Sequence, residues 1–198
     1  YTLSLGTPES MAKEAAIHKH RPILKLKLGT QEDITRVRAI RAAAPDTRLV
    51  IDANTGWRFS QLKEYIPQLA ALGVEMIEQP LGEDEEHLLA DFESEIPLVA
   101  DESCLDSSSL ARLKGRYQGV NIKLDKTGGM TEALALLEAA QNQGFDIMVG
   151  CMIGTSLGMA PALLVAQQAR WVDIDGPLLL AKDRQPALRY EGSIVHPD

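Results

Sequence analysis

The sequence predicts an α/β fold in which eight parallel strands and seven helices alternate and close into a modified TIM barrel. Strand-like and helix-like hydrophobic periods take turns along all 198 residues. Charged residues also recur near the ends of five successive strand-like runs, at intervals of 25, 26, 23 and 22 residues: Lys27, Asp52, Glu78, Asp101 and Lys123. An active site at the carboxyl ends of barrel strands requires one such residue from each of several strands.

The predicted elements follow in order. Strand-like runs cover 1–6, 23–29, 48–54, 74–80, 97–103, 119–125, 146–152 and 171–176. Helical periodicity lies between them, at 8–20, 31–44, 60–72, 82–94, 106–114, 130–143 and 156–169. Capping residues such as Thr7 and Ser60 stand where helices should begin, and Gly73 and Gly144 where they should end. Right-handed crossovers between parallel strands then favour a closed barrel over an open sheet.

We expect residues 1–198 to form a single barrel domain of a longer protein. The composition, 45% hydrophobic, suffices for one sizeable core. No low-complexity linker divides the chain, and it begins at Tyr1 rather than at an initiator methionine. Residues 177–198 contain no convincing eighth helix, so they predict a tail that either packs on another domain or frays.

Charge and composition limit the classes of partner that we expect. The net charge is −8, and the Lys and Arg residues are scattered, which is not the footprint of a nucleic-acid-binding protein. No apolar run approaches the roughly 18 residues of a membrane span. Cys104 and Cys151 fit a reduced intracellular protein better than a disulfide framework. We expect neither nucleic acid nor membrane as a partner and a cytoplasmic location, and the sequence leaves the oligomeric state open.

Strand alternation predicts that lysines face the barrel axis. In LKLKL, Lys25 and Lys27 share one face and the leucines share the other. In NIKLD, Asn121, Lys123 and Asp125 share a face. Leucines can pack against helices, so the ammonium groups should point inward. Burying an unpaired charge costs several kcal/mol, so each must be compensated by another residue, a metal or a ligand.

Three carboxylates predict a metal site. Asp52, Glu78 and Asp101 end the third, fourth and fifth strands, which are neighbours in a barrel. Carboxylates that converge on one point repel each other unless a hard cation joins them. All-oxygen ligation indicates Mg²⁺, with Mn²⁺ as an alternative. The simpler interpretation, that each is an isolated strand-end residue or helix cap, does not account for the regular spacing or the flanking lysines.

Lys27 and Lys123 predict a proton transfer. A metal-bound carboxylate has an acidified α-proton, because the cation stabilises the enediolate formed on deprotonation. A lysine on each face of that carbon can remove the proton from one side and return it on the other, which inverts the stereocentre. A lysine in this role needs a pKa lowered from about 10.4 toward about 7–8, and the metal and the adjacent Lys25 both act in that direction. The alternative for either lysine is a salt bridge to a neighbouring carboxylate.

Asp173 and Asp175 predict a binding site for a cation. Both lie in WVDIDGP, on one face of the eighth predicted strand, and no protein cation is obviously assigned to them. A substrate ammonium group would pair well with two carboxylates. Capping of the following loop is the alternative.

These residues resemble a known family. The Lys25-x-Lys27 pair, the three carboxylates and Lys123 resemble the muconate-lactonising-enzyme subgroup of the enolase superfamily, which uses lysine bases with metal-stabilised enediolates. Asp173-Ile-Asp175 resembles a motif of its dipeptide epimerases. The segments DANTGW, EQP, ADES and GCMIGTS also look like family segments, and the resemblance covers essentially all 198 residues.

The resemblance implies a (β/α)₇β barrel of the enolase C-terminal domain-like class. It implies an isomerase that epimerises a dipeptide of the L-Ala-D/L-Glu type, as in cell-wall peptide metabolism. Lys27 and Lys123 would exchange the proton, Lys25 would tune Lys27, and Mg²⁺ would lie on Asp52, Glu78 and Asp101. Asp173 and Asp175 would hold the dipeptide's α-ammonium group, and Asn54 and Glu102 would hydrogen-bond near the metal.

The resemblance also implies a partner domain and leaves two alternatives. Family members carry an α+β capping domain, built mainly from the N-terminal part, and nothing in residues 1–198 corresponds to it. One alternative keeps the enediolate but changes the outcome, to o-succinylbenzoate synthesis or a cycloisomerisation. The aspartate pair argues against it, because those substrates have no ammonium group. The other alternative is a non-catalytic metal-binding barrel or oligomer scaffold, which would need neither lysine.

Overall fold

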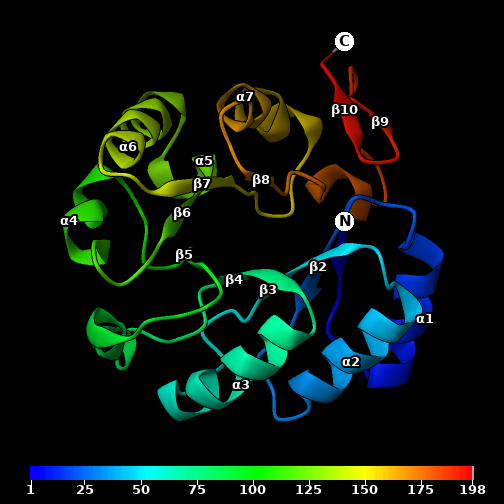
Figure 1. The fold of residues 1–198 in the computed structure, drawn as a ribbon. Coiled ribbons are helices and arrows are strands. Elements are labelled where there is room, and N and C mark those ends of the chain that lie inside the picture. The colour runs from blue at the N-terminus through cyan, green and yellow to red at the C-terminus, as the bar shows by residue number, and fades with distance from the viewer. Residues whose placement is uncertain (198) are drawn as a thin grey trace. The chain divides into compact units, whose positions relative to one another are not determined.

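The computed structural model describes residues 1–197, and their contacts divide them into two compact units. The first unit is Tyr1–Leu98, and the second begins at Val99 (Figure 1). Strands and helices alternate in both units, as the sequence predicts. Within residues 1–197, no helix has the length and apolar character needed to cross a membrane.

The first unit contains four parallel strands in the order β1-β2-β3-β4. In Figure 1, α2 lies between α1 and α3 along these strands. The elements are β1 (Thr2–Leu3), α1 (Pro8–His18), β2 (Ile23–Lys27), α2 (Asp33–Ala43), β3 (Arg48–Asp52), α3 (Phe59–Ala71), β4 (Val74–Glu78) and the 3₁₀ helix η1 (Glu86–Asp91).

Local sequence explains how the first unit packs. The Thr7 side chain caps α1 by accepting a hydrogen bond from the Ser10 amide at 3.2 Å, and Pro8 follows at the first helical position. Apolar strand residues alternate with the charged ones and are fully buried. They meet apolar residues that recur at helical spacing on α2 and α3. This core includes Leu24, Leu26, Leu49, Ile51, Ile77, Val37, Ile40, Leu62 and Leu69.

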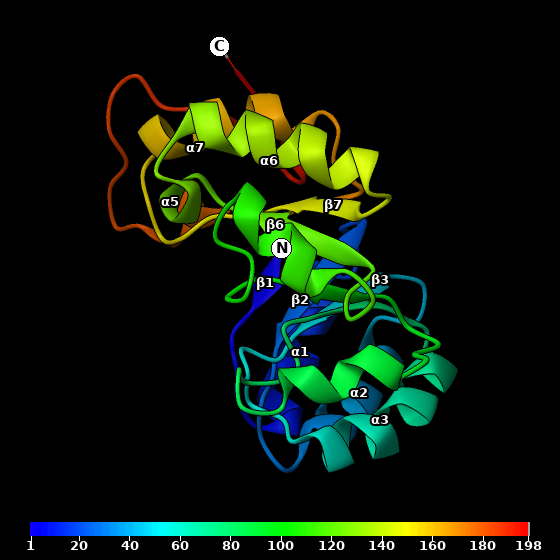
Figure 2. The same cartoon turned by 90° about the vertical axis from the view of Figure 1, so that its left-hand side faces the viewer.

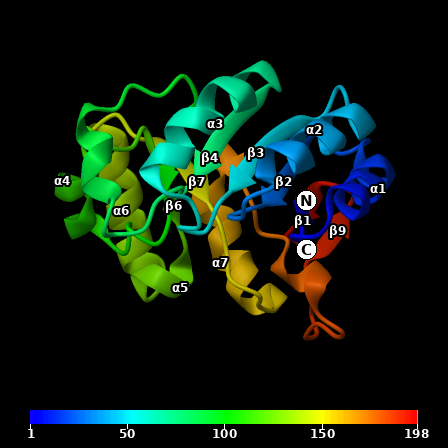
Figure 3. The same cartoon turned by 90° about the horizontal axis from the view of Figure 1, so that it is seen from below.

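The second unit continues the pattern with parallel strands in the order β5-β6-β7-β8. Helix α6 lies beside α7 in Figure 2 and beside α5 in Figure 3. The elements are β5 (Leu98–Ala100), η2 (Ser107–Ser109), α4 (Leu110–Leu113), β6 (Gly119–Ile122), α5 (Leu124–Thr127), α6 (Met130–Asn142), β7 (Asp146–Val149), α7 (Ser156–Ala166), β8 (Trp171–Val172), η3 (Gly176–Leu179), β9 (Arg189–Glu191) and β10 (Ile194–His196).

The helix predicted at 82–94 is wrong in type, because the structure has only the 3₁₀ helix η1 there. The acidic residues at the start of this segment contact the N-terminal end of the preceding helix, α3, instead. Glu85 Oε2 accepts a hydrogen bond from the Phe59 amide at the start of α3, at 2.5 Å. Asp84 forms an ion pair with Arg58 at 2.7 Å. These tertiary contacts fix the acidic run in a turn before a regular α-helix can begin.

The helix predicted at 106–114 is also shorter than expected. The Asp106 carboxylate accepts hydrogen bonds from the Ser108 amide at 3.0 Å and the Ser108 hydroxyl at 2.6 Å. Short polar side chains of this kind compete with the backbone for hydrogen bonds and favour turns over helix interiors. The three serines therefore form η2, and only one α-helical turn, α4, follows.

All eight predicted strands end earlier than expected, and in two of them this corrects the placement of three acidic residues. β6 ends at Ile122, and Asp125 lies in the first turn of α5 rather than on the strand face with Lys123. β8 ends at Val172, so Asp173 and Asp175 follow the strand instead of alternating along it. The chain turns into η3 at Gly176, before a longer strand can form.

Part of the predicted tail has regular structure. It contains η3 and an antiparallel hairpin in which Tyr190 pairs with Val195. As expected, the described part of 177–198 contains no α-helix.

Candidate active site

In the first unit, three neighbouring strands bring charged residues together. Lys27 stands opposite Asp52 in the register of β2 and β3, and Asp52 stands opposite Glu78 in the register of β3 and β4. Because parallel strands end at a common edge, charged residues that are far apart in sequence become neighbours. Leu24 and Leu26, on the opposite face of β2, are buried, as is Leu28 just after the strand.

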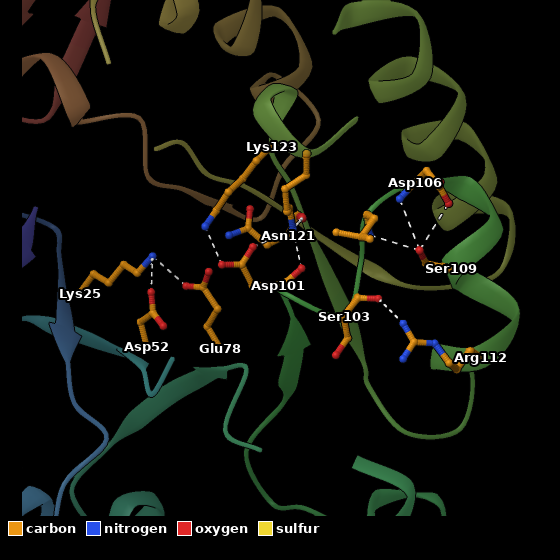
Figure 4. A network of polar contacts seen from close by, with 12 residues as sticks. Lys25, Asp52, Glu78, Asp101, Ser103, Asp106, Ser109, Arg112, Asn121 and Lys123 are labelled. Atoms are coloured by element: carbon orange, nitrogen blue, oxygen red, sulfur yellow. Dashed lines mark hydrogen bonds and ion pairs between the residues drawn. The ribbon is translucent and has the colours of Figure 1, made fainter. Parts of the chain in front are cut away.

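Lys25 lies between two buried carboxylates. Its Nζ is 3.1 Å from Asp52 Oδ2 and 2.8 Å from Glu78 Oε2. Figure 4 draws both contacts as dashed lines. Asp52 and Glu78 are 0% exposed and Lys25 is 4% exposed. At this depth a charge is tolerated only with a partner. The ammonium group thus compensates both carboxylates and fixes their relative positions.

Lys27 lies on the same carboxylate but in a different environment. Its Nζ is 2.6 Å from Asp52 Oδ2 and donates to Asn54 Oδ1 at 3.1 Å. The Lys27 side chain is 35% exposed, against 5% for Lys25. Lys27 is therefore the lysine of this pair that solvent or a ligand can reach, while Lys25 is enclosed.

The turn after β3 places Asn54 beside Lys27. Asn54 and Thr55 have positive φ values of 42° and 62°. The Asp52 carboxylate also accepts a hydrogen bond from the Asn54 amide, at 3.1 Å. A side-chain carboxylate that bonds the backbone two residues on stabilises a turn, and asparagine tolerates positive φ better than most residues.

Asp33 is a residue of this region that the sequence reasoning missed. It is 0% exposed, and its Oδ2 accepts hydrogen bonds from the Gly29 and Thr30 amides, each at 2.8 Å, and from Trp57 Nε1 at 2.7 Å. Its Oδ1 lies 3.1 Å from Arg36 Nη1. Asp33 therefore joins the loop after β2 to the loop after β3. Its position at a helix start gave no signal beyond an ordinary acidic first turn.

In the second unit, Asp101 follows β5 and lies between two lysines. Lys123 Nζ is 2.5 Å from Asp101 Oδ2 (Figure 4), and Lys126 Nζ is 2.6 Å from Asp101 Oδ1. Lys126 also donates to the backbone oxygens of Asp101 at 2.6 Å and Asn121 at 2.9 Å. Lys126 was not predicted as a site residue, because the one-turn helix α5 that returns it to Asp101 is not apparent from the sequence.

The lysines hold Asp101 in its charged form. Burial acts to raise the pKa of Asp101, but the positive charges of Lys126 and Lys123 and their hydrogen bonds act in the other direction. The net result is a pKa lowered to about 2. Asp101 is therefore a carboxylate throughout the neutral pH range.

Gly150, after β7, makes room for this cluster. A Cβ at Gly150 would lie 2.7 Å from Asn121 Nδ2 and 3.0 Å from Lys123 Cε. Any larger residue would displace the Asn121 and Lys123 side chains, so the glycine of the GCMIGTS segment leaves space for Lys123, which follows the neighbouring strand β6.

Asp173 and Asp175 flank a buried isoleucine after β8. Both aspartates are partly buried, and Ile174 between them is 3% exposed. The Asp173 amide donates to Val149 O of β7 at 2.9 Å, and Asp175 O accepts from the Leu178 amide at 2.9 Å. Backbone contacts thus hold both aspartates at the carboxyl end of β8, within the second unit.

The predicted residues fall into two groups. Lys25, Lys27, Asp52 and Glu78 are brought together in the first unit. Asp101 and Lys123 are brought together in the second unit. Among residues 1–197, no group of three or more His, Cys, Asp or Glu side chains is spaced to hold a metal ion.

Comparison with known proteins identifies relatives of the whole chain. Residues 10–193 match the family described as enolase C-terminal domain-like. An N-acetyl-D-glutamate racemase from a Pseudoalteromonas species is 50% identical over 197 residues, covering 100% of this chain and 62% of the racemase. The L-Ala-D/L-Glu epimerase of Escherichia coli K12 is 46% identical over 197 residues, covering 98% of this chain and 61% of the epimerase. The chain thus spans about three fifths of each relative.

Solved structures agree with this match. An enolase family member from Agrobacterium tumefaciens with homology to dipeptide epimerases, with bound sodium and L-Ala-L-Glu, superposes with a TM-score of 0.97 at 52% identity. That match covers 100% of this chain and 61% of the other. A dipeptide epimerase from Cytophaga hutchinsonii, complexed with Mg and D-Ala-L-Val, gives a TM-score of 0.93 at 30% identity, covering 99% and 57%. The fold class predicted from the sequence is confirmed.

Proposed function

Because the chain belongs to the enolase C-terminal domain-like family, we propose that the protein containing it inverts the α-carbon of an N-acylated glutamate. The leading candidate substrate is the dipeptide L-Ala-D/L-Glu. The names of two relatives support this class, because N-acetylglutamate and an alanyl-glutamate dipeptide both carry an acyl group on the glutamate nitrogen. Both relatives are named for inversion rather than elimination, which favours epimerisation over a dehydration or cycloisomerisation.

The observation that carries the proposal is the difference in environment between the two lysines of β2. Lys25 is enclosed by Asp52 and Glu78, whereas Lys27 contacts Asp52 and remains 35% exposed. An enclosed ammonium group supplies fixed positive charge, and an accessible one can meet a substrate proton. We assign Lys27 as one acid–base group and Lys25 as the residue that tunes it.

Lys123 is proposed as the second acid–base group. Because Lys123 is only 6% exposed, this assignment rests on the family resemblance and not on exposure. The Lys123 ammonium group lies on Asp101, and Gly150 leaves the space that its Cε occupies. The scheme requires Lys27 and Lys123 to act on opposite faces of the α-carbon, so that one lysine removes the α-proton and the other delivers a proton to the opposite face. The product then has the inverted configuration.

Mg²⁺ is the proposed cofactor, with Mn²⁺ as an alternative. Asp52 and Glu78 are buried oxygen donors on adjacent strands, and a single cation, the Lys25 ammonium group, already lies within 3.1 Å of both. Asp101 is the third proposed ligand, and its lowered pKa leaves it charged. Hard divalent cations prefer such carboxylate oxygens. When bound, the metal would stabilise the negative charge that develops on the substrate carboxylate.

Asp173 and Asp175 are proposed to bind the substrate's α-ammonium group. This assignment separates the two candidate substrates, because L-Ala-L-Glu carries an ammonium group and N-acetylglutamate does not. The 50% identity to an N-acetyl-D-glutamate racemase supports N-acetylglutamate as the second candidate. Measuring kcat/KM for both substrates on the protein with its N-terminal domain decides between them. Higher kcat/KM for the dipeptide supports the leading candidate, and higher kcat/KM for N-acetylglutamate favours the second.

Substitution of each lysine tests the two-base scheme. Lys27→Ala and Lys123→Ala should each abolish epimerisation of L-Ala-L-Glu in D₂O, measured by NMR with Mg²⁺. Each variant should still exchange the α-proton of one glutamate configuration, and the two variants should retain opposite configurations. Lys13→Ala and Lys114→Ala, at exposed positions of the two units, are matched controls that should behave as wild type.

Two results would contradict the scheme. Loss of exchange from both configurations in both variants would argue against one lysine per face. Turnover that survives exhaustive treatment with EDTA would argue against the metal. Restoration of EDTA-treated enzyme by Mg²⁺ is the expected result.

A further inference from the structure

The C-terminal tail returns to the loop that carries the aspartate pair. Tyr190, in β9, donates its hydroxyl hydrogen to Ile174 O at 2.8 Å, across 16 residues of sequence. Ile174 is the residue between Asp173 and Asp175 and is 3% exposed. The contact lies entirely within the second unit.

This hydrogen bond fixes a backbone group that the sheet does not. β8 ends at Val172, so the Ile174 carbonyl lies beyond the strand ladder. A peptide unit is planar, and the plane that contains the Ile174 carbonyl also contains the amide nitrogen and Cα of Asp175. Holding that oxygen therefore restricts the rotation of the plane from which the Asp175 side chain projects.

A second anchor fixes the tail itself. The Asp183 carboxylate accepts hydrogen bonds from the Ser156 amide at 3.0 Å and from the Ser156 hydroxyl. The Leu188 amide in turn donates to Ser156 Oγ at 2.9 Å. Ser156 is the first residue of α7 and is 3% exposed. The tail is thus tied to the start of α7 two residues before Tyr190, which limits where the Tyr190 ring can lie.

The Tyr190 hydroxyl is a hydrogen-bond donor at neutral pH. Burial raises the pKa of Tyr190, and the nearby Cys151, Asp175 and Asp183 add to this increase. A tyrosine phenol is already protonated at neutral pH, and the raised pKa extends the range in which the hydroxyl can donate to a carbonyl oxygen.

We propose that Tyr190 is a positioning residue that holds the Asp173–Asp175 loop for the substrate ammonium group, and so makes the C-terminal tail a determinant of substrate selectivity. This inference rests on the proposed function. Tyr190 does not itself touch the substrate in this scheme. Loss of the Tyr190 hydroxyl should therefore weaken the binding of only those substrates that use the aspartate pair.

The test is Tyr190→Phe in the protein with its N-terminal domain, assayed with L-Ala-L-Glu and with N-acetyl-L-glutamate. The substitution removes one oxygen and keeps the ring. Losing one hydrogen bond should raise KM for L-Ala-L-Glu by about 5-fold, with kcat within about 2-fold of wild type. The KM of N-acetyl-L-glutamate, or its inhibition constant if it is not turned over, should stay within about 2-fold. Asp183→Asn, which weakens the second anchor, should shift selectivity in the same direction.

Controls separate the possible failures. Tyr65→Phe, a buried tyrosine of α3 whose hydroxyl has only a 3.5 Å contact with Gln61, is the matched control and should leave both constants unchanged. If the wild type acts on neither substrate, the proposed function fails and the inference fails with it. If the wild type is active but Tyr190→Phe leaves the constants of both substrates unchanged, or raises both by the same factor, the inference alone is overturned. The proposed function survives that result.

Discussion

Buried carboxylates of this protein form ion pairs with lysines from neighbouring strands and turns. Asp101 is the clearest case, because Lys123 contacts one carboxylate oxygen and Lys126 the other. In the first unit, the Lys25 ammonium group forms ion pairs with two carboxylates. Breaking such a pair leaves a buried charge without compensation, which is strongly destabilising. The lowered pKa of Asp101 therefore makes stability depend on pH.

The pH dependence of stability should show the contribution of Asp101. Its pKa is about 2 in the folded protein, against about 3.9 in an unfolded chain. Because the folded pKa is lowered, the stabilisation is fully present above pH about 4 and is lost as the pH falls through about 2. Two units correspond to about 2–3 kcal/mol. Urea unfolding from pH 2 to 6 with EDTA should show the free energy difference between wild type and Asp101→Asn shrinking below pH 4.

The control for this measurement is Asp91→Asn, at an exposed position in η1. It should change the free energy of unfolding little at any pH in the series. A difference between wild type and Asp101→Asn that does not vary with pH would contradict the assignment.

The two cysteines should differ in reactivity. Cys104 is 0% exposed, and burial raises the pKa of its thiol to about 11. Only the thiolate reacts quickly, so Cys104 should resist a thiol reagent at pH 8 in the folded protein. Cys151 is partly exposed and should react first. In Cys151→Ser, thiol labelling should require unfolding, and rapid labelling of that variant would contradict the prediction.

At the scale of elements, the loops after β2 and β3 must approach closely to bring Lys27 beside Asn54. Asp33 binds the first loop through two backbone amides and the second through Trp57. Glycines at the crossing allow this approach. A Cβ on Gly56 would lie 2.6 Å from Gly29 Cα and 2.9 Å from Ala53 O, and all of these neighbours are backbone atoms that cannot move aside cheaply.

Gly56→Ala should therefore destabilise the first unit by about 1–3 kcal/mol, because overpacking against backbone forces the loops apart. The matched control is Gly158→Ala in α7, where an added Cβ meets no atom within 4 Å. Replacing a helical glycine with alanine should stabilise by about 0.5–1 kcal/mol. Thermal unfolding should show that Gly56→Ala is less stable than the wild type and that Gly158→Ala is more stable. A Gly56→Ala variant as stable as wild type would show that the loops can separate at no cost.

At the scale of the whole molecule, the proposed chemistry draws on residues from both units and on sequence outside this chain. The chain spans 62% and 61% of two relatives that are named for racemisation and epimerisation. The family resemblance predicts a capping domain that closes over the barrel mouth. Closure excludes water, which would otherwise weaken the electrostatic interactions between the lysines and the substrate.

Residues 1–198 alone should accordingly show little or no epimerisation of L-Ala-L-Glu, while a version extended by an N-terminal capping domain should be active. Circular dichroism and calorimetric titration with Mg²⁺ on both versions distinguish loss of the site from loss of folding. Comparable turnover by the two versions would refute the prediction.

The sequence by itself determined the order of strands and helices and the positions of charged residues near strand ends. These features depend on local periodicity, so LKLKL indicates a strand with two lysines on one face wherever that strand lies. The fold class followed from the same pattern and is confirmed by the family match. The roles assigned to Lys27, Lys123, Asp52, Glu78 and Asp101 remain predictions that the experiments above test.

The tertiary structure alone decided the contacts between segments that are distant in sequence. Lys126 reaches Asp101 only because a one-turn helix follows β6, and Tyr190 reaches Ile174 only because the tail folds into a hairpin. Asp33 and Glu85 fix the positions of loops, because they accept hydrogen bonds from residues in other segments. Such contacts depend on which loops meet in space. The periodicity of a single strand or helix carries no information about that, so they had to be seen in the folded chain.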